Sequence, residues 1–385
     1  MTTEQSQVRL LQAVSATSSF DRFVVGPLLL TIAADFGVTL AGAAAVASLY
    51  FLLYGLSQPV WGLCSDRFGR VRTMRVTLCA ACVFGVLSSL APTLELLVLS
   101  RALTGACIAA AVPSALVYVG DVVPFVRRQS VLTDLNAASA LGITSAIGLG
   151  GVLAATVGWR AAFLLPALLA GALAVILSRL PEPPRASGHE GGLRVALRSR
   201  WGRRVLLLAL VEGAALLGLL TYLAPAVESG GASPTQAGAL VALYGVGLLL
   251  TSRIVKRLAG RVRPAGFLAV GSAALVLAYA AVAVSQAPVL VAVAALVVGS
   301  GWAAMHSTMQ AWATEVVPEA RATLVSLFAA SLFVGSGVAT AVLAPLAGGL
   351  RWGPLFSVGV ALSVVFGIAA TLGIARFDRR VELAV

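Results

Sequence analysis

The stretch GLCSDRFGRVR, residues 62–72, decides how the rest of the chain is interpreted. It places one aspartate and three arginines within seven residues, and an apolar run flanks it on each side. A helix of about 20 apolar residues crosses the hydrocarbon core of a bilayer, whereas a short charged segment stays outside it. The stretch therefore predicts a loop between two transmembrane helices.

The composition of the chain agrees with that prediction. Of its 385 residues, 59% are hydrophobic and 11% are charged, whereas soluble domains carry about 25% charged residues. The net charge of +12 does not indicate a nucleic-acid partner, because the basic residues stand in short clusters between apolar runs and not with aromatic residues on one soluble face. We expect an all-α integral membrane protein surrounded by lipid.

Apolar runs of the required length recur along the whole chain. They predict twelve spans, near residues 10–34, 42–63, 73–93, 94–120, 131–156, 159–180, 204–227, 236–255, 265–286, 288–314, 322–346 and 353–375. One set of alternate loops holds Arg67, Arg70, Arg72, Arg75, Arg127, Arg128, Arg253, Lys256, Arg257, Arg261, Arg263 and Arg321, and the other set holds only Arg160 and Arg351. Basic loops stay on the cytoplasmic side. Both termini are thus expected in the cytoplasm, with the chain in the bacterial cytoplasmic (cell) membrane.

The two halves of the chain repeat each other. DRFGRVR at 66–72 matches RLAGRVR at 257–263 with an offset of 191, which also places Asp21 on Glu212. DVVPFVRR matches EVVPEARA with an offset of 194, and WRAAF matches WGPLF with an offset of 193. We expect a six-helix bundle over 1–180, a cytoplasmic linker over 181–203 and a second bundle over 204–385. Two such pseudo-symmetric bundles suit an alternating-access transporter.

Two motifs resemble those of a known family, the major facilitator superfamily. Residues 62–72 are similar to its signature loop, with Gly62, Asp66, Arg67, Gly69, Arg70 and Arg72 on the motif positions. RALTGACIAAAVPSA, from Arg101, is similar to the fourth-helix motif of the twelve-helix drug:proton antiporter branch. The resemblance implies the major facilitator fold and proton-coupled transport of small molecules.

The fifth predicted helix departs from that branch. GITSAIGLGG, residues 142–151, keeps Gly142, Gly150 and Gly151 but has Ala146 and Ile147 where the branch has a Gly-Pro pair. The small residues still permit close helix packing. The missing proline weakens the prediction of export.

Five of the ionisable residues within the predicted spans lie far from the span ends, where a charge costs about 2.5–3.5 kcal/mol on insertion scales. Asp21 and Arg22 are adjacent, and consecutive helical residues point about 100° apart, so we expect different partners for them. Asp21 is a candidate proton-binding carboxylate, and Arg22 either favours its ionised form or contacts an anionic group; the alternative is a structural ion-pair network.

Glu212, with no base in its own span, is a second candidate for binding the proton or the substrate; the alternative is that it simply reaches water at the cytoplasmic mouth. Arg101 either influences proton exchange or extends outward to the interface, and His306 either lines the cavity or is satisfied within the core.

The signature loop predicts a gate at the cytoplasmic end. When the cytoplasmic side is closed, Asp66 can accept hydrogen bonds from a helix N-terminus or from an arginine of the other half. Asp121 and Arg127 are candidate partners. Gly62, Arg67, Gly69 and Arg70 complete the expected gate.

The sequence shows no nucleotide-binding loop, zinc signature or Ser/His/Asp arrangement, so we expect no enzymatic activity, cofactor or metal. The leading prediction is a monomeric secondary transporter that exports small amphipathic drugs or metabolites in exchange for protons. Proton-coupled or facilitated import of a small solute is the alternative within this class. A transport-inactive membrane sensor is the alternative from another class.

Overall fold

The computed structural model describes residues 3–183 and 192–382, which form helices and short connections. The first part contains α1 (Thr3–Phe23), η1 (Gly26–Leu28), α2 (Leu29–Phe36), α3 (Leu40–Ala43), α4 (Ala45–Phe68), α5 (Arg70–Ser89), α6 (Leu94–Ile108), α7 (Ala111–Val122), α8 (Phe125–Thr156), α9 (Trp159–Ile176) and η2 (Leu177–Arg179). The second contains α10 (Gly192–Arg198), α11 (Arg200–Gly213), η3 (Ala214–Gly218), α12 (Leu223–Ser229), α13 (Pro234–Val241), α14 (Leu243–Leu258), α15 (Pro264–Val284), α16 (Pro288–Gly301), η4 (Trp302–His306), α17 (Ser307–Glu315), η5 (Pro318–Ala320), α18 (Arg321–Gly348) and α19 (Trp352–Glu382). The described residues contain no strand beyond one isolated bridge between Ala259 and Val262.

The helices have the lengths that membrane crossings require. Eleven helical stretches of the described residues are long and apolar enough to span a bilayer. The remaining crossing is α1–η1–α2, where the first predicted span is interrupted by a 3-10 turn that begins at Gly26. Pro27 stands in this turn and has no N–H to continue the hydrogen-bond ladder of α1. The arrangement is the predicted twelve-helix, all-α membrane fold.

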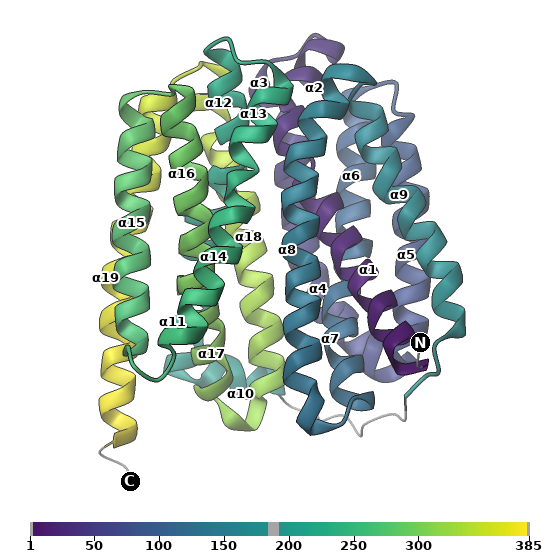
Figure 1. The fold of residues 1–385 in the computed structure, drawn as a ribbon, viewed down its shortest axis with the longest axis vertical. Coiled ribbons are helices and arrows are strands. Elements are labelled where there is room, and N and C mark those ends of the chain that lie inside the picture. The colour runs from purple at the N-terminus through teal and green to yellow at the C-terminus, as the bar shows by residue number, and fades with distance from the viewer. Residues whose placement is uncertain (1–2, 184–191, 383–385) are drawn as a thin grey trace.

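Figure 1 shows α1–α9 side by side in one group and α11–α19 in a second group. We call these groups the N-terminal half and the C-terminal half; the exact domain boundaries stay a prediction, and residues 184–191 of the predicted linker lie outside the described residues. The turns α4–α5, α7–α8 and α14–α15 all lie at the lower end of Figure 1. We call this the basic end, because it carries the arginine-rich loops.

Small residues bring the two halves into close contact. A Cβ atom added at Gly55 of α4 would lie 2.7 Å from the carbonyl oxygen of Ala330, and one at Gly337 of α18 would lie 2.7 Å from that of Ser48. On the other side of the molecule α8 meets α13, where a Cβ atom at Gly238 would lie 2.8 Å from the carbonyl oxygen of Ile147. Gly151, one of the glycines kept in the altered fifth-helix motif, lies in that crossing, as the packing argument predicted.

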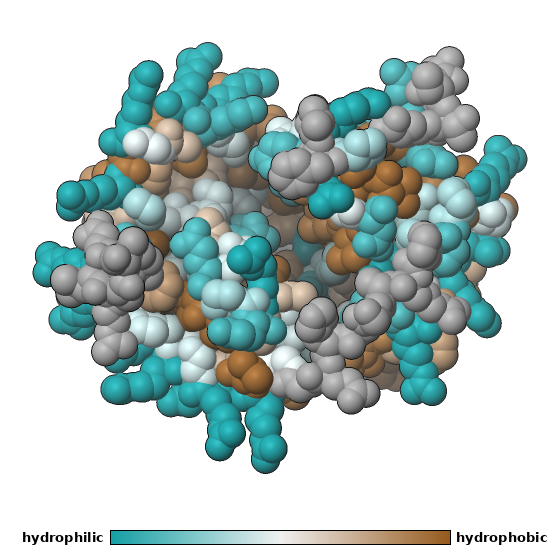
Figure 2. Space-filling model, turned by 90° about the horizontal axis from the view of Figure 1, so that it is seen from below, coloured by the Kyte–Doolittle hydropathy of each residue, from teal (hydrophilic) through white to brown (hydrophobic). Residues whose placement is uncertain are grey.

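The two ends of the molecule differ. Seen from below, the basic end shows hydrophilic side chains around its rim and a recess between the two groups of helices (Figure 2). Toward the opposite end the halves touch, since Phe23 stacks on Tyr244 with ring centroids 6.5 Å apart and a Cβ at Gly26 would lie 3.6 Å from the carbonyl oxygen of Thr221. The described conformation is hollow from the basic end and closed at the other.

Candidate functional site

Asp21 and Arg101 form a fully buried ion pair between α1 and α6. Arg101 Nη1 donates to Asp21 Oδ1 at 2.7 Å, and its Nη2 donates to the backbone oxygen of Asp21 at 2.8 Å. Tyr50 of α4 donates its hydroxyl to Asp21 Oδ2 at 2.7 Å. The rings of Tyr50 and Phe163 lie 4.6 Å and 4.5 Å from the Arg101 guanidinium. The alternative that Arg101 extends outward to the interface is wrong, because its side chain is 0% exposed.

Arg22 makes quite different contacts, as expected for the neighbour of Asp21 on a helix. Its Nη1 donates to the hydroxyl of Tyr54 at 2.8 Å and its Nη2 to that of Ser19 at 3.2 Å. Its guanidinium carbon lies 5.3 Å, 4.9 Å and 4.9 Å from the ring centroids of Phe23, Tyr54 and Phe333, the last of these from α18 of the C-terminal half. Within 3–183 and 192–382 no carboxylate pairs with Arg22, and its buried Nε has no hydrogen-bond partner.

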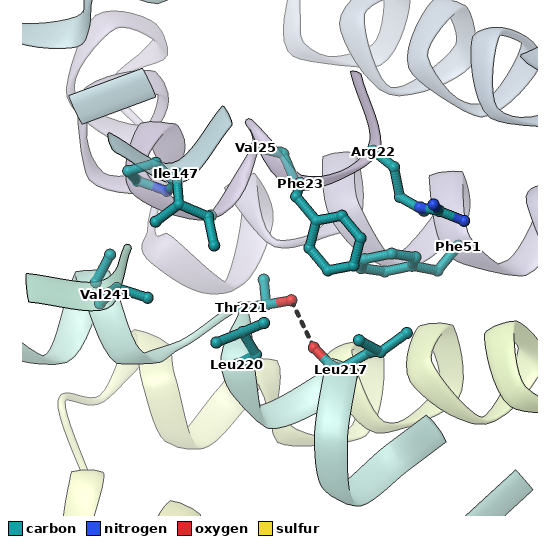
Figure 3. A pocket seen from close by; sticks show the side chains of 12 residues that line it. Arg22, Phe23, Val25, Phe51, Ile147, Leu217, Leu220, Thr221 and Val241 are labelled. Atoms are coloured by element: carbon teal, nitrogen blue, oxygen red, sulfur yellow. Dashed lines mark hydrogen bonds between the residues drawn. The ribbon is translucent and has the colours of Figure 1, made fainter. Parts of the chain in front are cut away.

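A pocket lies beside Arg22 at the contact between the halves. The N-terminal half contributes Arg22, Phe23 and Phe51, and the C-terminal half contributes Leu217, Leu220 and Thr221 to the opposite wall. Figure 3 shows the two phenylalanine rings facing Thr221 and Leu217, with Arg22 at one end. The lining is therefore apolar except for one guanidinium and one hydroxyl, and that hydroxyl donates to the backbone oxygen of Leu217 at 3.1 Å.

Glu212 and His306 form a second buried pair, within the C-terminal half. Glu212 Oε1 lies 3.4 Å from His306 Nδ1, and the Glu212 side chain is 0% exposed, which contradicts the alternative that it reaches water. Neither carboxylate oxygen has a hydrogen-bond partner among the described residues. The His306 ring stacks on Trp302 at 4.2 Å and on Phe328 of α18 at 5.6 Å. The sequence showed no base for Glu212, because its partner comes from a different span.

Both members of this pair adjoin π-helical turns. Glu212 lies near the end of α11, just before η3, and His306 is the last residue of η4. A π-helical turn inside an α-helix is uncommon and is found frequently at functional sites. Periodicity in the sequence gave no sign of either turn.

The predicted gating residues lie in the N-terminal half. Arg70, at the start of α5, contacts Asp66 of α4 through Nη1 and Asp121 of α7 through Nε at 3.3 Å. In this conformation, which is open at the basic end, Asp66 pairs with Arg70, four residues along the chain. Its pairing with an arginine of the other half, expected when that end is closed, stays a prediction. Arg67 lies in the last turn of α4 and Arg127 in the first turn of α8. Gly62 faces the other half, where a Cβ would lie 4.0 Å from Ser326 Oγ.

Glu182 completes this cluster and was missed in the sequence. Its carboxylate accepts hydrogen bonds from the backbone N–H groups of Val71 and Arg72, each at 3.0 Å. It therefore caps the N-terminus of α5, the role considered for Asp66. Gly69 has φ +107° and a Cβ there would lie 2.6 Å from Glu182 Cδ, so only glycine suits the position. The Pro-rich surroundings of Glu182 had indicated only a solvated connector.

In the part of the chain that the structure describes, no group of three or more His, Cys, Asp or Glu side chains could hold a metal ion. Each half instead contains one buried ionisable pair, Asp21–Arg101 in the N-terminal half and Glu212–His306 in the C-terminal half of the described residues.

The molecule consists of two groups of helices that meet at one end and contain buried ionisable pairs. This arrangement is typical of multi-pass membrane transporters. The chain belongs to the Major Facilitator Superfamily, whose family model matches residues 13–340. The family model thus assigns the chain to a family of membrane transporters.

Individual relatives are distant. The chain is 31% identical over 161 residues to the putative transporter svop-1 of Caenorhabditis elegans, a match that covers 41% of this chain and only 31% of that protein. It is 26% identical over 375 residues to the chloramphenicol resistance protein of Streptomyces lividans, covering 94% of each. Among solved structures, a bacterial homologue of the human lysosomal transporter Spinster, described as inward-facing and unoccupied, aligns with a TM-score of 0.74 at 18% identity over 96% of each chain.

Proposed function

We propose that this transporter exports small amphipathic molecules in exchange for protons by alternating access. The basic end then faces the cytoplasm, because arginine-rich loops are retained there, and the described conformation is open to the cytoplasm. The full-length similarity to a chloramphenicol resistance protein supports export.

The observation that carries the proton-coupling part is the Glu212–His306 pair. Both side chains are ionisable, and neither Glu212 oxygen has a hydrogen bond to a described residue. When the pair holds one proton, Glu212 and His306 are either both ionised or both neutral, and the net charge is zero in each case. One additional proton leaves the pair with a charge of +1. Because a buried unpaired charge is costly, that proton changes the stability of the conformation around it.

Helix α18 links this pair to the contact between the halves. Phe328 of α18 lies against His306, and Ser336 of α18 donates its hydroxyl to the backbone oxygen of Gly213 at 3.1 Å, directly after Glu212. The same helix crosses α4 at Gly55 and Gly337. A shift of α11 or η4 upon protonation would therefore move α18 and with it the crossing of α4 and α18, because these helices pack directly against one another.

Glu212→Gln tests the proposal. The substitution keeps the shape of the side chain and removes the titratable group. In proteoliposomes with an imposed proton gradient, we expect the proton flux opposite to substrate transport to fall at least about tenfold, because the group that carries the proton is removed. Substrate binding to the purified variant should persist. Glu95→Gln is the control, because Glu95 is an exposed acid in the first turn of α6. Unchanged proton movement in Glu212→Gln would remove this pair from the mechanism.

Import by proton symport is the second candidate, and one observation favours it. Helix α8 runs unbroken from Phe125 to Thr156, without the Gly-Pro pair of the exporter branch. The direction of proton flow upon substrate addition decides between the two. In antiport, protons leave the compartment that the substrate enters. In symport, protons enter that compartment together with the substrate.

A further inference from the structure

We propose that Arg22 and Tyr244 together bind the anionic group of the substrate, so that the transported molecules are lipophilic anions with an aromatic or aliphatic body. This inference rests on the proposed transport function and narrows its substrate class. The proposal places the negatively charged group of the substrate at the contact between the two halves.

The first step is the unbalanced charge of Arg22. The two buried arginines of the N-terminal half differ sharply, because Arg101 is neutralised by Asp21 whereas Arg22 has only hydroxyl and ring contacts in the described chain. The Arg22 side chain is buried, and its Nε has no partner. An isolated buried guanidinium is unfavourable unless a negative group accompanies it. Hydrogen bonds from Nε and one Nη form the fork that binds a carboxylate or phosphate oxygen pair.

The second step is an unused hydroxyl from the other half. Tyr244 of α14 is fully buried, its hydroxyl has no hydrogen-bond partner in the described residues, and its ring stacks on Phe23, the neighbour of Arg22. The guanidinium carbon of Arg22 lies 5.3 Å from the centroid of the same Phe23 ring. A buried hydroxyl usually finds a partner. An anion at Arg22 supplies one, and it thereby connects a donor from each half.

The third step is the surroundings of the two donors. Phe23 and Phe51 form one wall of the adjacent pocket, and Leu217 and Leu220 form the other. Of the acids nearest in sequence to this site in the described part of the chain, Asp21 is held by Arg101 and Glu212 lies beside His306. Glu228 lies one helical turn beyond the lining residue Ala224 and is not itself part of the lining. The site therefore offers a positive donor group beside apolar surface, which matches an amphipathic anion and disfavours an amphipathic cation.

Binding to the purified full-length protein tests the substrate class without depending on proton coupling. The probes are 2-naphthoate, its neutral amide 2-naphthamide and the cation 2-naphthylmethylammonium, measured at neutral pH by calorimetry in detergent. We expect the carboxylate to bind at least about tenfold more tightly than the amide, as expected for a charge-assisted fork, and the cation to bind least. Equal affinities, a preference for the cation, or no binding of the carboxylate at roughly millimolar concentration would overturn the proposal.

Variants of the two donors assign the effect to them. Arg22→Gln should abolish the preference for the carboxylate over the amide, and Arg22→Lys should restore part of it, because lysine keeps the charge and loses the planar fork. Tyr244→Phe keeps the stacked ring and removes only the hydroxyl, so it should weaken carboxylate binding several-fold and leave amide binding unchanged.

Tyr118→Phe is the matched control, because Tyr118 also has a buried hydroxyl without a partner but lies on α7, away from this pocket. A thermal melt of each variant confirms folding. If the preference survives in folded Arg22→Gln, Arg22 does not bind the anion. If the preference is present but Glu212→Gln leaves proton movement unchanged, the proton-coupled function fails and the anion site stands.

Discussion

At the scale of single residues, two Asp–Arg pairs of the N-terminal half have the same ion-pair length and opposite burial. Asp21 and Arg101 are 2% and 0% exposed, whereas Asp35 and Arg160 are 42% and 46% exposed, and each pair has a 2.7 Å contact. Asp21→Asn leaves a buried guanidinium without its counter-ion, so we expect a loss of about 3–5 kcal/mol in the free energy of unfolding. Asp35→Asn should cost less than about 1 kcal/mol. Unfolding of both variants in mixed detergent micelles by SDS titration measures the difference.

A charge-neutral double variant separates a structural role of Asp21 from a role in proton transport. Asp21→Asn combined with Arg101→Gln removes both charges and should recover more than half of the lost stability. Recovery of proton-driven transport as well would show that the pair is a structural lock between α1 and α6. Equal losses for Asp21→Asn and Asp35→Asn would show that burial does not set the strength of these pairs.

The exposed pair also defines a pH control. The hydrogen bond from Arg160 holds the pKa of Asp35 below its usual value of 3.8. A carboxylate with a lowered folded-state pKa contributes stability that is present above its unfolded pKa and is lost as the pH falls through the folded value. The Asp35–Arg160 pair therefore stays ionised across roughly pH 5–8. A change in the transport rate between roughly pH 5 and pH 8 therefore comes from the ionisation of other groups.

At the scale of elements, the glycines at the helix crossings set how closely the halves approach. A Cβ atom at Gly151 of α8 would collide with the carbonyl oxygen of Pro234 at the start of α13, whereas one at Gly120 of α7 would meet no atom within 4 Å. Gly151→Ala should therefore push α8 away from α13 and favour a conformation that is open at the end opposite the basic end. Nitroxide labels at Ala34 and Gly230, in protein lacking its four cysteines, report that opening as a longer distance by double electron–electron resonance.

Gly120→Ala is the matched control for this element. It should leave the distance distribution unchanged, because the new methyl group meets nothing. An unchanged distribution in folded Gly151→Ala would mean that the α8–α13 contact does not limit closure of the opposite end.

At the scale of the whole molecule, the proposed charge of the substrate and the proposed exchange for a proton together determine the net charge carried across the membrane in each transport cycle. Export of one anion in exchange for one proton moves two charges in the same electrical direction, while symport of the two is electroneutral. Each charge contributes about 2.3 kcal/mol per 100 mV, so an inside-negative potential of about 100 mV should raise the equilibrium anion gradient by up to about three orders of magnitude. Potassium diffusion potentials set with valinomycin in proteoliposomes measure this dependence, and its absence would contradict one-for-one antiport of an anion.

Several features of the molecule follow from the sequence alone, because the bilayer imposes them on any chain. Apolar runs of sufficient length must become helices, since lipid satisfies no backbone hydrogen bond, and arginine-rich turns such as 66–72 must lie at one end. The adjacency of Asp21 and Arg22 likewise predicted different partners, because consecutive helical residues diverge. The packing role of Gly151 followed from its size.

The tertiary structure alone decided which side chains meet. Arg101 reaches Asp21 across 80 positions of sequence, and Glu182 reaches Val71 across 111. His306 likewise reaches Glu212 from a different span. In a soluble helix the polar face marks the side that turns away from the core, but in a membrane helix both the lipid-facing side and the protein-facing side are apolar. The sequence therefore determined where each helix crosses and which end is basic, whereas the rotation of each helix, and with it every partner in the site, was settled only by packing.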